Sequence, residues 1–324
     1  MRPQSLMNPE AAWQDGTFRT YLVILIGVLV NAGVVLALLT WGLRKDVRSI
    51  WVIYRSWLVM TTLALGAIFL GRVPTIIFFT ALAVIAFNEF ARATGLHKDR
   101  WMTGAVNLAI LALGGSAIAP DPATGQPGWF GLFAAIPMIA VAAILLIPVV
   151  RNRADGQLQR MALSVLGFTC TGWLFLHLAF LADAPGRYGY LMYLVFAVQL
   201  SDIAAFIFGR WLGRSGRRPL RSLISPNKTW EGAAGALVVS LALPWVMWFS
   251  FPHFRPAQLV LTGLIVGIGG QLGDLSMSVI KRDLGIKDMG AIIAGHGGVL
   301  DRIDSLLFTA PLFTHMVNHY FRLW

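Results

Sequence analysis

Repeated apolar segments of nearly uniform length constrain the fold of this chain more than any other feature. A helix that crosses the hydrocarbon core of a bilayer needs about 20 apolar residues, within a range of roughly 17–25. Segments of approximately this kind occur at Tyr21–Gly42, Trp57–Leu70, Val73–Glu89, Met102–Ala119, Trp129–Val150, Met161–Leu181, Tyr188–Phe208, Ala233–Phe251, Gln258–Ile280 and Ser305–Tyr320. Lipid offers the backbone no hydrogen-bond partners, so these segments predict an all-α integral membrane protein with about ten transmembrane helices.

The second segment is short, and only Gly71 and Arg72 separate it from the third. This spacing predicts either a tight helical hairpin or a single re-entrant element at that place.

The distribution of basic residues supports the count of ten spans. Cytoplasmic loops of membrane proteins carry an excess of Lys and Arg. With the N-terminus outside, the odd-numbered loops of this chain hold 20 of its 26 Lys and Arg residues. Removing or adding one span would destroy this alternation. The net charge of +11 therefore reflects membrane topology, and we expect no nucleic-acid partner.

Acidic residues are concentrated in the last third of the sequence. Only 13% of the residues are charged, against about 25% in soluble domains, and seven of the 15 acidic residues lie between residues 202 and 304. We therefore divide the chain into an N-terminal tail (residues 1–18), N-terminal transmembrane helices that we expect to form a platform (residues 19–185) and a C-terminal transmembrane domain in which we expect the functional site (residues 186–324).

Asp202 and Asp274 fall within or at the end of apolar segments. An ionisable group at membrane depth costs about 2.5–3.5 kcal/mol on insertion scales, which makes both residues functional candidates. The alternative is a buried ion pair between helices.

The region with the highest density of charge runs from Ser276 to Ser305. Asp301 and Asp304 are three residues apart, so both would project from one face of a helix that starts near Gly298. Gly297 and Gly298 permit a tight turn and a close approach of the backbone to a ligand. Carboxylates beside Lys, Arg and His suit Mg²⁺ that shares its coordination with phosphates. A solvated loop with ordinary salt bridges is the alternative.

A second polar region runs from Ser201 to Gly235. Pro226 argues against a helix at its centre, and Thr229 or Asn227 could cap the helix that follows. The N-terminus of such a helix favours a phosphate. Taken alone, the basic loop in this region would more often determine topology or bind lipid.

These regions together resemble the phosphatidate cytidylyltransferase (CDP-diacylglycerol synthase) family. The resemblance rests on Ser278-x-x-Lys281-Arg282, Lys287-Asp288, His296-Gly297-Gly298-x-x-Asp301-Arg302-x-Asp304, Ile224-Ser225-Pro226-x-Lys228-Thr229-x-Glu231-Gly232, Ser201-Asp202 and Gly273-Asp274. It covers residues 195–315 well, and before them only Glu89-Phe90 is similar to the family. The chain departs from the pattern at Ala294, where the family usually has Pro or a small turn residue, and in the insert Arg214–Arg221.

The resemblance implies a Mg²⁺-dependent reaction in phospholipid biosynthesis, in which CTP and phosphatidate give CDP-diacylglycerol and pyrophosphate. The metal ligands would be Asp274, Asp301 and Asp304, with a second divalent or a monovalent cation as an open alternative. The other residues implied in catalysis are Lys281, Arg282 and His296. Those implied in substrate binding are Asp202, Ser225, Lys228, Thr229, Glu231, Lys287, Asp288, Gly297, Gly298 and Arg302.

The resemblance also implies a multi-pass protein of the inner or plasma membrane. Its polar catalytic cavity would lie in the C-terminal helices and face the cytoplasm, so that CTP arrives from there and phosphatidate from the bilayer. A homodimer through the N-terminal helices is an open alternative.

Three other functions compete with this interpretation. The first is a paralogous enzyme with a different lipid-phosphate acceptor or nucleotide. The second is a secondary transporter that uses the intramembrane carboxylates Asp202 and Asp274; transporters of this kind usually show repeated halves, which this sequence lacks. The third is a non-catalytic lipid-binding or scaffold protein, which would not need three carboxylates among four cationic side chains.

Overall fold

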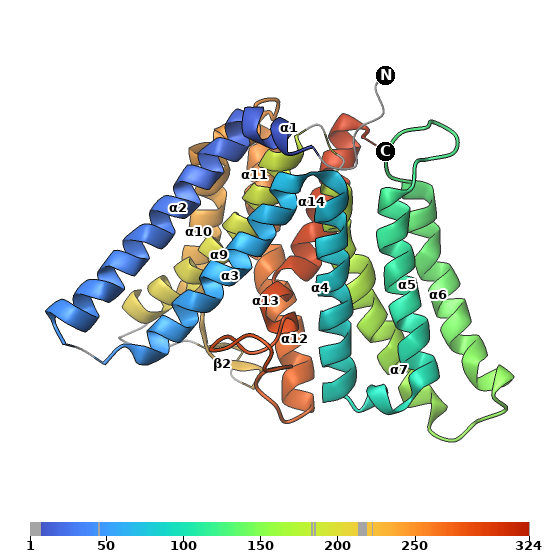
Figure 1. The fold of residues 1–324 in the computed structure, drawn as a ribbon. Coiled ribbons are helices and arrows are strands. Elements are labelled where there is room, and N and C mark those ends of the chain that lie inside the picture. Colours follow the sequence, from blue (N-terminus) through green and yellow to red (C-terminus); the bar gives the residue numbers. More distant parts are fainter. Residues whose placement is uncertain are drawn as a thin grey trace.

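The computed structural model describes residues 8–44, 46–182, 184, 186–212, 219–221 and 223–323. Long helices lie side by side and make up most of this structure (Figure 1). Within the described residues the one sheet has two short antiparallel strands, β1 (Pro219–Arg221) and β2 (Ser225–Thr229). The predicted all-α class is therefore confirmed.

Eight helical segments in the described residues are long and apolar enough to cross a membrane. They are α2 with η1 (Gly16–Ala37, Leu38–Gly42), α3 (Arg48–Leu70), α4 (Arg72–Ala93), α5 (Arg100–Ile118), α6 (Phe130–Val150), α7–η3–α8 (Gln157–Gly167, Phe168–Leu174, Phe175–Leu181), α9 (Arg187–Trp211) and α11–η6–α12 (Pro256–Leu264, Ile265–Gly269, Gly270–Asp283). The other two predicted spans fall on shorter helices, α10 (Trp230–Val246) and α14 (Leu306–Phe321). Eight spans are thus supported by length and composition, and ten remains a prediction.

The remaining helical elements are short. They are α1 (Pro9–Gln14), η2 (Leu96–Lys98), η5 (Trp248–Ser250) and α13 (Leu300–Ile303).

The second and third predicted spans form a helical hairpin. Helix α3 begins at Arg48, earlier than the expected Trp57, so it is a full 23 residues long. Gly71 separates α3 from α4 and has φ 114°, which only glycine adopts readily. The guanidinium of Arg72 donates hydrogen bonds to the carbonyl oxygens of Ala117 and Ile118 at 2.6 and 3.0 Å, which ties this turn to the end of α5.

The basic connections, which are predicted to face the cytoplasm, lie at one end of the molecule. Figure 1 shows the α2–α3, α4–α5 and α6–α7 connections, strand β2 and the loop after α12 at the end opposite to α1. This is the arrangement that alternating basic loops require. Of the insert Arg214–Arg221, residues 214–218 lie outside the described residues, as does Lys45.

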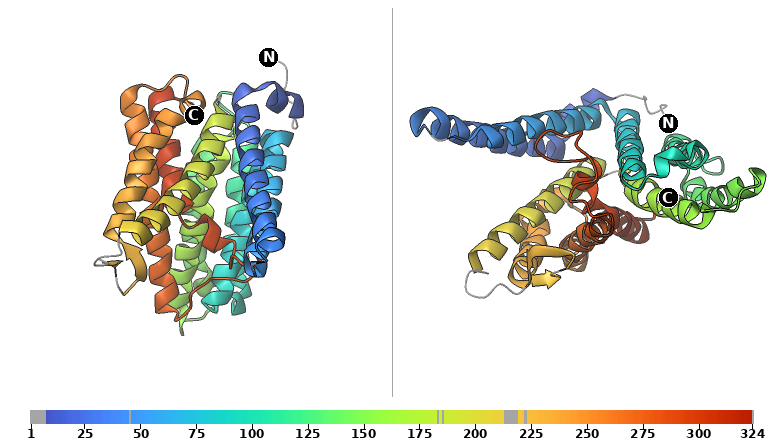
Figure 2. Two further views of the ribbon diagram at one scale, coloured as in Figure 1. Left: turned by 90° about the vertical axis from the view of Figure 1, so that its left-hand side faces the viewer. Right: turned by 90° about the horizontal axis from the view of Figure 1, so that it is seen from below.

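Helices α2 and α3 extend away from the other helices as an arm (Figure 2, right). Only 6% of each apolar span is buried, compared with 61% of the span Gln157–Leu181. The expectation of a homodimer through the N-terminal helices stays a prediction.

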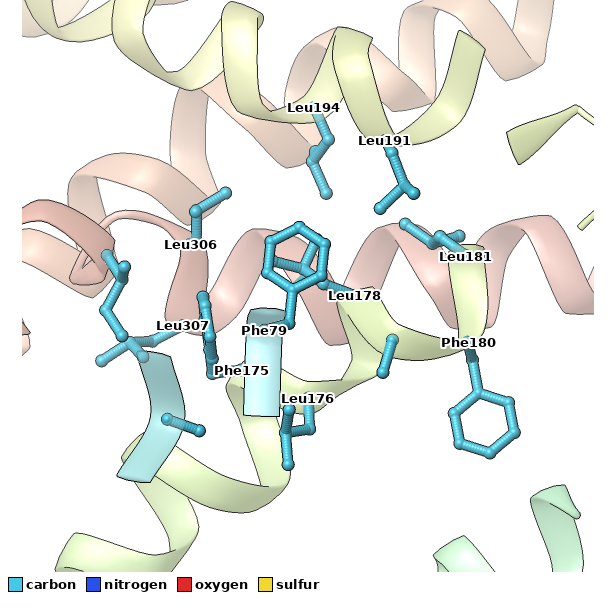
Figure 3. Close-up of a cluster of buried hydrophobic side chains, with 14 of the residues drawn as sticks. Phe79, Phe175, Leu176, Leu178, Phe180, Leu181, Leu191, Leu194, Leu306 and Leu307 are labelled. Carbon is cyan, nitrogen blue, oxygen red and sulfur yellow. The ribbon is translucent and has the colours of Figure 1, made fainter. Parts of the chain in front are cut away.

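The packed centre of the molecule joins helices from both halves of the chain. Phe79 of α4 contacts Phe175 of α8, with ring centroids 5.9 Å apart, and Leu191 of α9 and Leu307 of α14 lie in the same cluster (Figure 3). Between helices in a bilayer, close packing of such side chains supplies the association energy, since lipid is as apolar as the core. The cluster adjoins α13, the short helix that carries Asp301.

Candidate active site

The turn of α13 carries two buried carboxylates that share one amine. The Nζ of Lys281, from α12, lies 3.0 Å from Oδ1 of Asp301 and 3.6 Å from Oδ2 of Asp304. All three side chains are buried. The predicted projection of Asp301 and Asp304 from one helical face is confirmed, since a single ammonium group reaches both.

Two further carboxylates come from other helices. Asp274 of α12 forms an ion pair with Lys228 of β2 and accepts a hydrogen bond from the Ser278 hydroxyl at 3.2 Å. The Ser305 hydroxyl donates to Oδ2 of Asp202, in the second half of α9, at 3.3 Å. We call Asp202, Lys228, Asp274, Lys281, Asp301 and Asp304 the carboxylate–lysine cluster.

Like charges within the cluster affect Asp304, which lies in the turn between α13 and α14. Burial, together with the negative charges of Asp274 and Asp202, raises the pKa of Asp304 to about 7, and the charge of Lys281 opposes this change. Its Oδ1 also accepts the backbone N–H of Ser305 at 2.8 Å. The cluster therefore holds more negative charge than its two lysines neutralise.

The glycine turn has the geometry expected from its sequence. Gly297 has φ 85°, and Oδ2 of Asp301 accepts the backbone N–H groups of Met289 and Gly298 at 2.8 and 3.0 Å. A Cβ atom on Gly298 would lie 2.6 Å from Oε2 of Glu89, closer than two unbonded atoms can approach. Gly298 is therefore needed for close packing and Gly297 for its backbone conformation.

Four buried polar atoms around the glycine turn and α10 have no hydrogen-bond partner within the described part of the chain: Nδ1 of His296, Nε of Arg302, Oε2 of Glu231 and Oε1 of Glu89. The His296 ring packs edge-on against Trp57 of α3, with centroids 6.0 Å apart. Burial and the nearby charge of Arg302 lower the pKa of His296, so its imidazole is neutral near pH 7. Buried polar atoms without partners are available to a polar ligand.

The other predicted site residues lie at the margin of the cluster. Arg282 is exposed and donates from Nε to the carbonyl oxygen of Ile224 at 3.2 Å, which attaches the strand hairpin to α12. Lys287 and Asp288 are exposed, and Ser225 is half-buried. The Thr229 hydroxyl accepts the Gly232 N–H at 3.1 Å and so caps α10, which selects Thr229 over Asn227, the two caps that the sequence allowed.

The donor set fits a hard cation, although no group of three His, Cys, Asp or Glu side chains in the described residues is placed to hold a metal ion. Mg²⁺ usually takes one or two protein carboxylates and completes its shell with water and substrate phosphates. Asp301 and Asp304 already place carboxylate oxygens around one positive charge, that of Lys281. The three metal ligands named from the sequence remain a prediction.

Neither of the two surface cavities described in the structure is lined by a residue of this cluster. One, of about 420 Å³, is lined by residues of α5 and α6, including Arg100 and Trp101, and the other, of about 240 Å³, lies between η6, α12 and α14. Both are lined mainly by apolar groups. The predicted polar cavity at the carboxylates therefore stays a prediction.

The site also includes residues that sequence reasoning did not assign to it. Glu89 of α4, and Ser56 and Trp57 of α3, contact the loop between α12 and α13. All three belong to the segment interpreted as a platform. The signal for Glu89 was available, because a carboxylate at the end of an apolar span is a functional candidate by default. Ser56 and Trp57 had no comparable signal.

The sequence is similar to a known protein family and to several curated proteins. The sequence matches the model of the cytidylyltransferase family over residues 51–320, which includes α4, most of α3 and the whole carboxylate–lysine cluster. It is 29% identical over 304 residues to the uncharacterized protein YnbB of Escherichia coli (strain K12), covering 92% of this chain and 97% of that protein.

Two curated relatives are named phosphatidate cytidylyltransferase. The protein of Staphylococcus aureus (strain COL) is 34% identical over 248 residues, which cover 75% of this chain and 89% of the relative. The protein of Staphylococcus haemolyticus (strain JCSC1435) is 40% identical over 177 residues, which cover 54% of this chain and 66% of the relative.

Proposed function

Because this chain belongs to the cytidylyltransferase family, we propose that it transfers the cytidylyl group of CTP to phosphatidate, forming CDP-diacylglycerol and pyrophosphate. The observation that carries the proposal is the pair of buried carboxylates, Asp301 and Asp304, that share Lys281 on α12. A polyphosphate substrate needs cations at its oxygens, and a metal ion needs carboxylates, and this cluster brings both kinds of group together.

The reaction requires alignment and charge neutralisation more than covalent chemistry. A phosphate oxygen of phosphatidate attacks the α-phosphorus of CTP, the bond from this phosphorus to the bridging oxygen breaks, and pyrophosphate leaves. Lys281, Arg282, Lys287 and Arg302 bind phosphate oxygens and hold the reacting groups in line. Asp274, Asp301 and Asp304 would be the residues that hold Mg²⁺, and the ion would supply neutralisation of phosphate charge.

The remaining residues shape the ends of the site. Asp202, Lys228 and Glu231 line its polar wall, and the buried Oε2 of Glu231 accepts a hydrogen bond from substrate. His296, which is neutral near pH 7, orients a phosphate through an N–H group rather than by transferring a proton.

The arrangement of charged loops supports a cytoplasmic site in a multi-pass inner or plasma membrane protein. The basic connections and the loop after α12 share one end of the molecule (Figure 1), and basic loops face the cytoplasm. CTP therefore enters from the cytoplasm. Phosphatidate stays in the bilayer, because removing its chains from lipid costs about 0.8 kcal/mol per CH₂ group.

Pyrophosphate release by the purified protein in detergent tests the proposal. We expect release that requires CTP, phosphatidate and Mg²⁺ together, and that is lost in Asp301→Asn because the substitution removes the charge shared with Lys281. Asp155→Asn is the matched control, since Asp155 is exposed in the α6–α7 connection.

A folded parent protein that releases no pyrophosphate would contradict the proposal. Turnover with another lipid phosphate or another nucleotide would then identify a paralogous enzyme. Equal activity in Asp301→Asn would show that the cluster is not the catalytic centre.

A further inference from the structure

Glu89 is a buried carboxylate that the proposed reaction does not use. It lies near the end of α4 and is 2% exposed. Its Oε2 accepts the backbone N–H of Leu300 at 2.9 Å, across 211 residues of sequence. Its Oε1 has no hydrogen-bond partner among the described residues. Leu300 is the first residue of α13, so Glu89 holds the start of the helix that presents Asp301.

Two glycines allow the chain to close around this carboxylate. A Cβ atom on Gly290 would collide with Oε1 of Glu89, and one on Gly298 would lie 2.6 Å from Oε2. Neither position accepts a larger residue unless Glu89 moves. The α12–α13 loop (residues 284–299) therefore passes Glu89 twice at backbone distance. Packing of this kind leaves the carboxylate little freedom to change its rotamer.

Asp301 holds the same segment from inside the site. Its Oδ2 accepts the N–H groups of Met289 and Gly298, while its Oδ1 pairs with Lys281. Two carboxylates thus bind backbone N–H groups of this segment: Glu89 of α4 binds that of Leu300, and Asp301 of α13 binds those of Met289 and Gly298. Any displacement of Leu300 would move Asp301 relative to Lys281.

Helix α3 contacts the tip of the same loop. The Ser56 hydroxyl donates to the carbonyl oxygen of Ala294 at 2.6 Å, and Trp57 packs against the His296 ring. A Cβ atom on Gly295 would lie 3.2 Å from the side chain of Ile53. The N-terminal helices thus contact the loop at its tip and at its end, on α3 and on α4.

We propose that Glu89 is a positioning residue for the active site, acting as the hydrogen-bond acceptor that sets the start of α13 and thereby the placement of Asp301 and Asp304. Its effect on turnover rests on the proposed function, whereas its effect on the loop does not. The requirement is for an acceptor atom at the correct reach rather than for negative charge.

Two substitutions separate reach from charge. Glu89→Gln keeps an oxygen at the position of Oε2 and removes the charge. Glu89→Asp keeps the charge and shortens the side chain by one methylene, so its oxygen no longer reaches the Leu300 N–H. Asn88→Ala is the control, because Asn88 is the neighbouring residue of α4 and bonds to Asn107 of α5.

The experiment measures amide hydrogen exchange across the chain and kcat for pyrophosphate release in the same preparations. Glu89→Asp would leave the buried N–H of Leu300 without its acceptor, and an unsatisfied buried donor of this kind changes local opening by roughly tenfold. We expect Glu89→Asp to raise exchange by about that factor in residues 289–300, with α9 and α10 unchanged, and to lower kcat. We expect Glu89→Gln and Asn88→Ala to resemble the parent in both measurements.

Parent-like exchange in residues 289–300 of Glu89→Asp would overturn the proposal. So would a Glu89→Gln variant as impaired as Glu89→Asp, which would assign the role to charge. If the parent protein does not turn over CTP and phosphatidate, the proposed function fails, and the exchange comparison alone still decides whether Glu89 positions α13.

Discussion

Replacing Lys281 with methionine tests the electrostatics of the carboxylate–lysine cluster most directly. Methionine keeps the length of the buried side chain and removes the ammonium group shared by Asp301 and Asp304. Removing one member of a buried ion pair leaves uncompensated charge and typically costs about 3–5 kcal/mol of folding free energy. Two backbone N–H groups still bind Asp301, which places the expected loss at the lower end of that range.

The loss should depend on pH because Asp304 titrates within the accessible range. Its pKa is raised to about 7, so the folded state disfavours the ionised carboxylate. Asp304 therefore lowers the free energy of unfolding progressively as the pH rises from near 4 towards 7. Lys281 opposes this effect, and without it the pKa rises further. The destabilisation by Lys281→Met should therefore increase from pH 6 to pH 8, by about 1 kcal/mol for a further rise of one pKa unit.

Thermal unfolding in detergent at pH 6, 7 and 8 measures this dependence. Lys287→Met is the control, because Lys287 is exposed and substitutions of that kind usually change stability by less than about 0.5 kcal/mol. A Lys281→Met protein as stable as the parent at pH 8, or one destabilised equally at all three pH values, would refute the reasoning.

Two other substitutions test packing and charge elsewhere in the structure. Gly298→Ala should lose turnover and about 1–3 kcal/mol of stability, because its Cβ would lie 2.6 Å from Oε2 of Glu89. Thermal unfolding and pyrophosphate release measure both effects. Gly104→Ala on α5 is the control and should be neutral, because a Cβ there meets nothing within 4 Å. Asp99→Asn should lower the unfolding temperature at pH 7 without changing kcat. Burial raises the pKa of Asp99, but hydrogen bonds, led by that from Arg151, outweigh this effect and hold the pKa below its usual value, so the stabilisation exists above pH 4 and disappears in acid. A parent-like melting temperature for Asp99→Asn would argue against that ion pair.

The secondary structure and its segmentation could be predicted from the sequence because they depend on local properties. Each predicted apolar segment overlaps a helix, since the length of a span is set by the bilayer and its composition by lipid. The reversal at Gly71 and the glycine turn at Gly297 require positive φ, and glycine marks such positions in any sequence. The start of α3 was missed because Arg48 and Arg55 obscured the beginning of the apolar run.

Part of the site was also visible in the sequence. The spacing of Asp301 and Asp304 requires only the period of a helix, and the structure places both against Lys281. The contact of Lys228 with Asp274 joins a strand to a helix 46 residues away, and no sequence period relates the two.

Only the tertiary structure brought the N-terminal helices into the site. The sequence by itself determined a membrane protein of apolar helices, with basic residues in alternate loops and seven of its 15 acidic residues between residues 202 and 304. It did not determine that Glu89 would meet Leu300, because that contact depends on how α4 packs against α13. Hydrophobic periodicity specifies which face of a helix is buried. Which other helix packs against that face depends on how all the helices pack together.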